Sequence, residues 1–134
     1  MASELRVTTI ANNAGTESVD TTYVINGSAK AWVNFNGSGT IASRDSLNLS
    51  SLSDNGTGQY EVAVSSAFGN SNYGAMSSCS VVGSYPLFCQ IHSTSAWSTQ
   101  APTTTEFAIN SPNYNASGFG DPVYYTVTVH GDLA

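Results

Sequence analysis

The chain has 134 residues, with nine acidic and three basic side chains, a formal net charge of −6 and only 9% charged residues. A chain of this length forms one domain that can bury a core, and its low charge argues against disorder. The three cations, Arg6, Lys30 and Arg44, are too few and too scattered to make a basic surface, so we expect no binding to nucleic acid. No apolar run approaches the roughly 18 residues of a membrane-spanning helix, so we expect no membrane insertion. The first residues, MASELRV, lack the basic and apolar regions of a signal peptide.

The first 25 residues are predicted to form an extended N-terminal arm. Leu5 and Val7 alternate with polar residues, as in a short β-strand. Residues 11–18 are polar and predict a linker, and residues 22–25 predict a second short extended piece.

Three apolar residues of this arm, Leu5, Val7 and Ile10, are candidate anchor contacts. The polar stretch that follows separates them from the main domain, and a short isolated strand must pair with or pack on something to be stable. We therefore predict that the arm docks onto a neighbouring subunit or a larger particle, by packing or by strand addition.

Residues 26–134 are predicted to form one all-β domain, a sandwich of jelly-roll or related type. Clusters of Gly, Asn, Asp and Ser interrupt the sequence at roughly the 8–12-residue spacing that is typical of sandwiches and barrels. In the strand predicted at 29–35, alternate apolar residues such as Phe35 share one face and Trp32 points to the other. Either that second face is covered within the chain, or Trp32 contacts a neighbouring subunit.

Further turns and strands are predicted along this domain. The Asn-Gly pair at 36–37 and the Asp-Asn-Gly sequence at 54–56 predict turns. Segments 59–65, 104–109 and 123–130 predict strands, because apolar and polar residues alternate in them or because they are rich in β-forming residues.

The segments 73–82 and 86–94 are predicted to form a hairpin through the loop at 83–85. This register would place Cys79 opposite Cys89, within the Cα separation that a disulfide needs. Thiols stay reduced in a cytosol, so for a protein made there two buried free thiols are the favoured prediction and a disulfide is the alternative.

Aromatic residues in predicted loops suggest a binding surface. Trp97, Tyr114 and Phe119 lie in such loops, and the long loop predicted at 110–121 is rich in Asn, Ser, Pro and Gly. Exposed aromatic side chains in loops can form a patch for a ligand or partner. The alternative is that these residues cover the ends of the core.

The sequence offers no assembled catalytic or metal site. Its two histidines, His92 and His130, have no short-spaced set of partner ligands, and the cysteines form no C-x-x-C motif. There is no G-x-S-x-G nucleophile motif, and no carboxylate pair at a recognisable spacing. We therefore predict no enzymatic activity, no metal and no cofactor. A groove between subunits remains the alternative, with candidate acids Asp45, Asp54, Glu61, Glu106 and Asp121.

Residues 29–60 read AKAWVNFNGSGTIASRDSLNLSSLSDNGTGQY. This block resembles a module of tailed bacteriophages, especially marine ones, with the pattern A-K-A-W-V-N-F-N-G-x-G-T, then R-D-S, then D-N-G-T-G-x-Y. The module occurs in proteins called tail fibre, tail or structural proteins, and the resemblance covers about a quarter of the chain. It carries no known catalytic residue.

The resemblance implies a non-enzymatic structural protein of a phage virion, made in the bacterial cytoplasm. We expect a small surface component of the fibre or tail-tip type. The alternatives are a capsid decoration of the cement or head-fibre type, and a carbohydrate-binding receptor-recognition module. The expected partners are sister copies in a homotrimer or another oligomer, other virion proteins and a host surface glycan.

Overall fold

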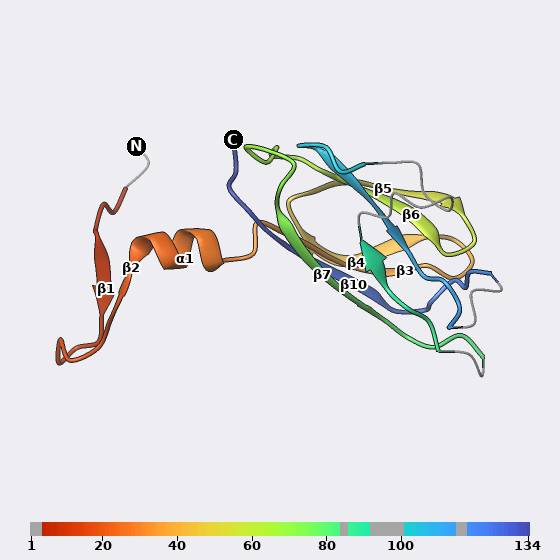
Figure 1. Ribbon diagram of the computed structural model, residues 1–134, viewed down its shortest axis with the longest axis horizontal. Coiled ribbons are helices and arrows are strands. Elements are labelled where there is room, and N and C mark those ends of the chain that lie inside the picture. The colour runs from red at the N-terminus through yellow and green to blue at the C-terminus, as the bar shows by residue number, and fades with distance from the viewer. Residues whose placement is uncertain (1–3, 84–85, 92–100, 115–117) are drawn as a thin grey trace.

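The protein is a two-layer β-sandwich with an N-terminal arm that projects away from it (Figure 1). The computed structural model describes residues 4–83, 86–91, 101–114 and 118–134. Over these residues the chain forms ten β-strands and one short α-helix, and the strands pair in an antiparallel manner. The prediction of an all-β domain is confirmed.

The first sheet has the strand order β4-β3-β10-β7. Its strands are β3 (Ala31–Asn36), β4 (Ala42–Leu47), β7 (Gly74–Cys79) and β10 (Tyr125–His130). The first and last strands of the sandwich, β3 and β10, lie side by side at the centre of this sheet, so the two ends of the domain meet there. A β-bulge after Asn34 interrupts the pairing of β3 with β4.

The second sheet has the strand order β5-β6-β9-β8. Its strands are β5 (Leu49–Gly56), β6 (Gln59–Val64), β8 (Gln90–Ile91) and β9 (Glu106–Asn110). The chain crosses from the first sheet to the second at Asn48, which has a φ of 57°. The side-chain amide of Asn48 donates to the carbonyl oxygens of Lys30 and Ser66, each at 3.1 Å, and so holds this corner.

The core lies between the two sheets and is built from strands whose residues alternate between buried and partly exposed positions. β3, β6 and β10 all follow this pattern. At the centre, the ring of Phe35 stacks on Tyr125 with centroids 5.2 Å apart, and it meets Tyr60 edge-on at 5.1 Å. The strands predicted at 29–35 and 59–65, and the inward direction of their apolar residues, are therefore confirmed.

The strand order does not by itself establish a jelly roll. The sequential strands β3 and β4 pair within the first sheet, and β5 and β6 pair within the second. These are simple hairpin connections. The structure therefore confirms an all-β sandwich but does not establish the jelly-roll topology.

The hairpin turns lie slightly later than the sequence predicted. β3 continues through Asn36, so the loop to β4 starts at Gly37. β5 continues through Gly56, and the turn to β6 falls at 57–58. The Asp-Asn-Gly sequence still bends the chain, because the Asp54 carboxylate accepts from the Gly56 N–H at 3.0 Å.

The arm has folded elements of its own. β1 (Thr9–Ala11) and β2 (Ser18–Asp20) form a hairpin, and α1 (Thr21–Gly27) follows directly. The prediction of an extended piece at 22–25 is therefore wrong, because these residues are helical. Most of the stretch 11–18, which was predicted to be a linker, is the turn of the hairpin. Residue 25, which ends the predicted arm, lies inside α1.

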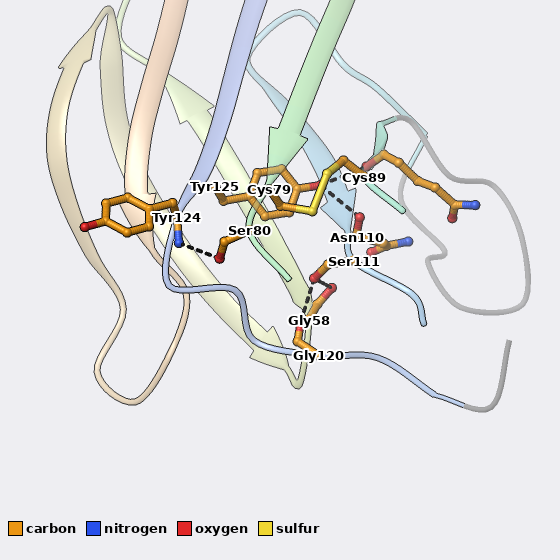
Figure 2. The surroundings of a disulfide bond; sticks show 10 residues. Gly58, Cys79, Ser80, Cys89, Asn110, Ser111, Gly120, Tyr124 and Tyr125 are labelled. Atoms are coloured by element: carbon orange, nitrogen blue, oxygen red, sulfur yellow. Dashed lines mark hydrogen bonds between the residues drawn. A yellow bond between two sulfur atoms is a disulfide. The ribbon is translucent and has the colours of Figure 1, made fainter. Parts of the chain in front are cut away.

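The segments around the cysteines do not form the predicted hairpin. β7 belongs to the first sheet and β8 to the second, so the chain crosses between the layers. Cys79, at the end of β7, forms a disulfide with Cys89, just before β8, and their Cα atoms are 6.2 Å apart (Figure 2). The favoured prediction of free thiols was wrong, because the crossing brings the two cysteines together between the sheets.

Candidate functional site: the N-terminal arm and the outer face of the first sheet

Short-range hydrogen bonds give the arm, residues 4–28, its local structure. The side chain of Asn12 accepts from the Thr16 N–H at 3.0 Å and closes the turn between β1 and β2. The Asp20 carboxylate caps α1 by accepting from the Thr22 N–H at 2.7 Å, and this hydrogen bond lowers the pKa of Asp20. The arm is thus one hairpin followed by about two turns of helix.

The arm exposes a large share of the apolar surface of the molecule. Seven of the fifteen large exposed apolar side chains in the described chain belong to it: Leu5, Val7, Ile10, Val19, Tyr23, Val24 and Ile25. Ile10 and Val19 lie opposite each other in the hairpin and so form one apolar surface. None of the three arm elements has a buried residue, and an isolated hairpin of this kind is only marginally stable. These properties make the arm the segment of the described chain to consider first as a docking surface.

Two side chains hold the base of the arm against the sandwich. Nδ1 of His130, the last residue of β10, lies 3.0 Å from the carbonyl oxygen of Gly27. The Lys30 ammonium contacts the carbonyl oxygens of Ile25 and Ser28. A cation at the last carbonyl groups of a helix is electrostatically favourable, so Lys30 stabilises the end of α1.

A polar cleft of about 240 Å³ lies at the same junction. Three asparagines and the end of β10 form most of it, and its lining is Asn26, Asn70, Asn72, Tyr73, His130, Gly131 and Asp132. Burial raises the pKa of Tyr73 to about 12, so its hydroxyl stays protonated and donates to the carbonyl oxygen of Thr103 at 3.0 Å. The base of the arm is therefore polar, in contrast to its exposed apolar surface.

The outer face of the first sheet, which points away from the core, carries an apolar row. The strand register places Leu47, Trp32, Thr128 and Met76 side by side across β4, β3, β10 and β7. Met76 is 67% exposed and Leu47 is 47% exposed, whereas Trp32 is partly buried. Trp32 thus lies on the face opposite the core, as its position in the sequence predicted.

Polar side chains border this apolar row on the same face. The amide of Asn34 donates to the hydroxyl of Thr126 at 2.9 Å across the two central strands. The guanidinium of Arg44 donates to the carbonyl oxygen of Val123 at 2.6 Å and lies 4.2 Å from the ring centroid of Tyr124. One of the three cations of the chain is therefore fixed beside the apolar row.

The sequence block at 29–60 supplies residues that hold the fold. A Cβ atom at Gly37 would clash with the hydroxyl of Tyr60, so a side chain cannot be accommodated there. The Asp121 carboxylate accepts from the Tyr60 hydroxyl at 3.0 Å and from the Gly58 N–H at 2.5 Å. Burial and the neighbouring Asp121 raise the pKa of Tyr60. Gly37, Gly58 and Tyr60 of this block therefore have structural roles.

The aromatic residues predicted as a loop patch have different environments. Tyr114 is 56% exposed, whereas Phe119 is partly buried and forms a β-bridge with Pro112. Trp97 lies outside the described residues. The structure therefore leaves Tyr114 as the exposed member of this set among the described residues.

The sequence reasoning missed Phe88, which lies close to Tyr114. Leu87 and Asn113 form an antiparallel bridge, and the Phe88 N–H donates to the carbonyl oxygen of Pro112 at 2.9 Å. In this antiparallel pairing Phe88 lies opposite Pro112 and Tyr114 lies opposite Pro86, so the two aromatic residues are diagonal neighbours, and Phe88 is 57% exposed. Phe88 was overlooked because the segment 86–94 was predicted to be a strand and not a loop.

The structure places the candidate acids on both sheets. Asp45 lies on β4 of the first sheet, whereas Glu61 and Glu106 lie at diagonal positions on the neighbouring strands β6 and β9 of the second. Within the described part of the chain, no three His, Cys, Asp or Glu side chains come together in a way that could hold a metal ion. His92 lies outside the described residues.

Comparison with known proteins finds no matching family model, no matching curated protein and no matching solved structure. Among the described residues, no helix is long and apolar enough to cross a lipid bilayer. The function of the chain has to be inferred from its own residues and geometry.

Proposed function

We propose that this protein is a non-enzymatic structural subunit of a tailed-phage particle, attached through its N-terminal arm and displaying its β-sandwich. The observation that carries the proposal is the exposed apolar surface of the arm, which includes the predicted anchor residues Leu5, Val7 and Ile10. Exposed apolar surface of this extent is costly in water and marks an interaction site. The resemblance of residues 29–60 to a phage module is the reason for proposing that the assembly is a phage particle.

The disulfide supports the proposal that the protein functions outside the cytosol. Cys79 and Cys89 join the two sheets of the sandwich, and disulfides persist in oxidising surroundings such as those of a released virus particle. The bond can form after the particle leaves the reducing host cytoplasm, because the fold already brings the two cysteines together.

The low share of charged residues supports close packing of copies. Charged residues make up only 9% of the chain, so there is little repulsion between copies that are crowded on a particle. We propose a homotrimer in a fibre or tail tip, because proteins that carry the phage-like motif are usually called tail fibre or tail proteins. Capsid decoration is the second placement, and the small size of the chain favours it.

Cryo-electron microscopy of the virus particle tests the placement. A sandwich with an arm that enters the tail tip or a fibre would support the first placement, and density of this shape on capsid hexamers or pentamers would support the second. If the protein is found only in infected cells and in neither part of the particle, the proposal of a virion subunit is wrong.

A carbohydrate-binding role is a second candidate, and the exposed pair Phe88 and Tyr114 favours it. Two exposed aromatic residues at diagonal positions beside one β-bridge offer apolar ring surface for the face of a sugar ring. Binding of the purified protein to host surface glycans should fall when both residues become Ser. Tyr124→Ser is the matched control, because Tyr124 is also 56% exposed but lies beside Arg44. Equal binding by all variants would exclude this surface.

A further inference from the structure

We propose that the outer face of the second sheet binds a neutral oligosaccharide through a row of amide side chains beside the aromatic pair Phe88 and Tyr114. The proposal rests on the second candidate function, carbohydrate binding by this pair, and it names the remainder of the site and the class of sugar. The amide row consists of Gln59, Asn110 and Gln90, one residue from each of the strands β6, β9 and β8.

The register of the second sheet places the three amides side by side. Asn110 pairs with Gln59 on one side and with Gln90 on the other. The adjacent pair, Ile109 and Tyr60, is buried in the core. Because successive side chains of a strand point to opposite faces, the amide row lies on the outer face of the sheet. Opposed side chains on neighbouring strands have Cβ atoms about 5 Å apart, so the row forms one continuous polar strip.

The aromatic pair lies on the same face as the amide row. The pairing of β8 with β9 continues in one register as far as the bridge between Leu87 and Asn113. The Tyr114 N–H donates to the carbonyl oxygen of Pro86 at 3.2 Å, which extends this pairing by one residue. Phe88 and Tyr114 lie two positions before and four positions after the amide-row residues of their own chain segments, and even separations along a strand return to the same face. The site is therefore longer than one sugar ring, since each residue of a strand adds about 3.4 Å.

The central residue of the row, Asn110, has an unsatisfied donor. Its side chain is buried, with 1% exposure, and Nδ2 has no hydrogen-bond partner among the residues that the structure describes. An unpaired buried donor is costly, so it calls for an acceptor. Gln90 is exposed and Gln59 is partly buried, so both flanking amides can reach a ligand. A sugar hydroxyl group that binds between them would accept from Nδ2 and complete the row.

The side chains of this face match the two kinds of surface on a sugar. A primary amide donates and accepts hydrogen bonds, as a sugar hydroxyl group does, so a row of amides fits the hydroxyl-bearing edge. The rings of Phe88 and Tyr114 offer apolar surface for the C–H face of a neighbouring sugar unit. An extended peptide would instead add to the backbone at a sheet edge, whereas these side chains lie on a sheet face. The arrangement therefore favours an oligosaccharide as the occupant.

Acidic neighbours make the preferred sugar neutral. Glu61 and Glu106 lie on the same outer face, two and four positions from the row along β6 and β9. The three cations of the chain, Arg6, Lys30 and Arg44, all lie outside the second sheet. Carboxylates accept hydrogen bonds from sugar hydroxyl groups but repel acidic sugars. The site therefore binds uncharged sugars and rejects sugars that carry uronic acids.

Three full-length variants divide the site into its parts. Gln59→Ala/Gln90→Ala removes the two accessible amides of the row, and Phe88→Ser/Tyr114→Ser removes the aromatic pair. Asn72→Ala is the matched control, because it removes an exposed amide from the polar cleft at the base of the arm, outside the proposed site. Circular dichroism checks that each variant keeps the β-sandwich.

The probes are immobilised neutral hexose sugars, from monosaccharides to longer oligosaccharides, and matched oligosaccharides that contain uronic acids. Wild type and Asn72→Ala should bind the longer neutral oligosaccharides equally well, and at least about tenfold more tightly than monosaccharides or the acidic oligosaccharides. The variant Gln59→Ala/Gln90→Ala should lose at least about tenfold in affinity for the neutral oligosaccharides, because their hydroxyl groups lose two amide partners.

The outcomes separate this proposal from the carbohydrate role on which it rests. If Phe88→Ser/Tyr114→Ser loses binding while Gln59→Ala/Gln90→Ala binds like wild type, the aromatic pair binds sugar and the amide row is not part of the site. A wild-type protein that prefers the acidic oligosaccharides would show that the proposed ligand class is wrong. If the wild type binds none of these sugars, both the carbohydrate role and the amide-row site are wrong.

Discussion

Nδ1 of His130 lies 3.0 Å from the carbonyl oxygen of Gly27. The contact joins the last residue of the last strand to the last residue of the arm helix, which are 103 positions apart in the chain. Because β10 pairs with β3 at the centre of the first sheet, the base of the arm is fixed to the most buried part of the sandwich. Together with Lys30, this contact sets the direction in which the arm leaves the domain.

We predict that His130→Ala loosens α1 and leaves the sandwich folded. Loss of one hydrogen bond at the end of a short helix costs roughly 0.5–1.5 kcal/mol, which is enough to increase local opening several-fold. Hydrogen exchange at the amides of residues 21–28 measures it. His130→Asn should restore much of the protection, because its side-chain amide can donate from nearly the position of Nδ1. Unchanged exchange in His130→Ala would show that the contact does not hold the arm.

We predict that Gly37→Ala destabilises the sandwich by about 1–3 kcal/mol, because the new methyl group would collide with the Tyr60 hydroxyl in a packed core. Chemical denaturation followed by tryptophan fluorescence gives the free energy of unfolding. Gly27→Ala is the control, since a Cβ atom there meets nothing within 4 Å. Equal stability of the two variants would contradict the structural role assigned to the motif.

We predict that removing the disulfide lowers the free energy of unfolding of the sandwich by roughly 2–3 kcal/mol, the magnitude expected for a short closed loop. The substitutions Cys79→Ser and Cys89→Ser, made together, and reduction of the wild type should give similar losses in a denaturation experiment. A wild-type protein whose unfolding is the same with and without reductant would mean that the cysteines are not bonded in solution.

The stability of the sandwich should fall in alkaline solution. Burial raises the pKa of Tyr73 to about 12 from an ordinary value of 10.0, and burial also raises the pKa values of Tyr60 and Tyr125. The unfolded chain then loses these protons at lower pH than the folded chain, so the stabilisation is complete below pH 10 and declines above it. Denaturation midpoints at about pH 8 and about pH 11 measure the decline. Tyr73→Phe should weaken the pH dependence, and a midpoint that does not fall would disprove the assignment.

The sequence predicted the strands that have one apolar face and one polar face. β3 and β6 alternate so regularly that their inward residues, including Phe35 and Tyr60, could be named before the structure was known. The side of Trp32 followed from the same alternation. Period-two patterning is a local property, and one strand shows it without any information about the rest of the fold.

The features that depend on distant contacts could not be predicted in this way. α1 was missed because Thr22 and Val24 are β-branched, although Asp20 as a cap and Gly27 as an end were signals for a helix. The disulfide depended on the crossing between sheets, which two isolated segments do not reveal. The apolar row required the register of four strands that are far apart in the sequence.

The amount of this protein in purified virus particles, measured after the arm is altered, is the most direct test of its proposed role as an arm-anchored subunit. Deletion of residues 1–25, or the full-length variant Ile10→Asp/Tyr23→Asp, should leave a folded sandwich by circular dichroism and remove the protein from gradient-purified particles. The control Val81→Asp should be present at the wild-type level, because Val81 is 63% exposed and lies outside the arm. If the arm variants are incorporated as well as wild type, the arm is not the anchor and the account is wrong.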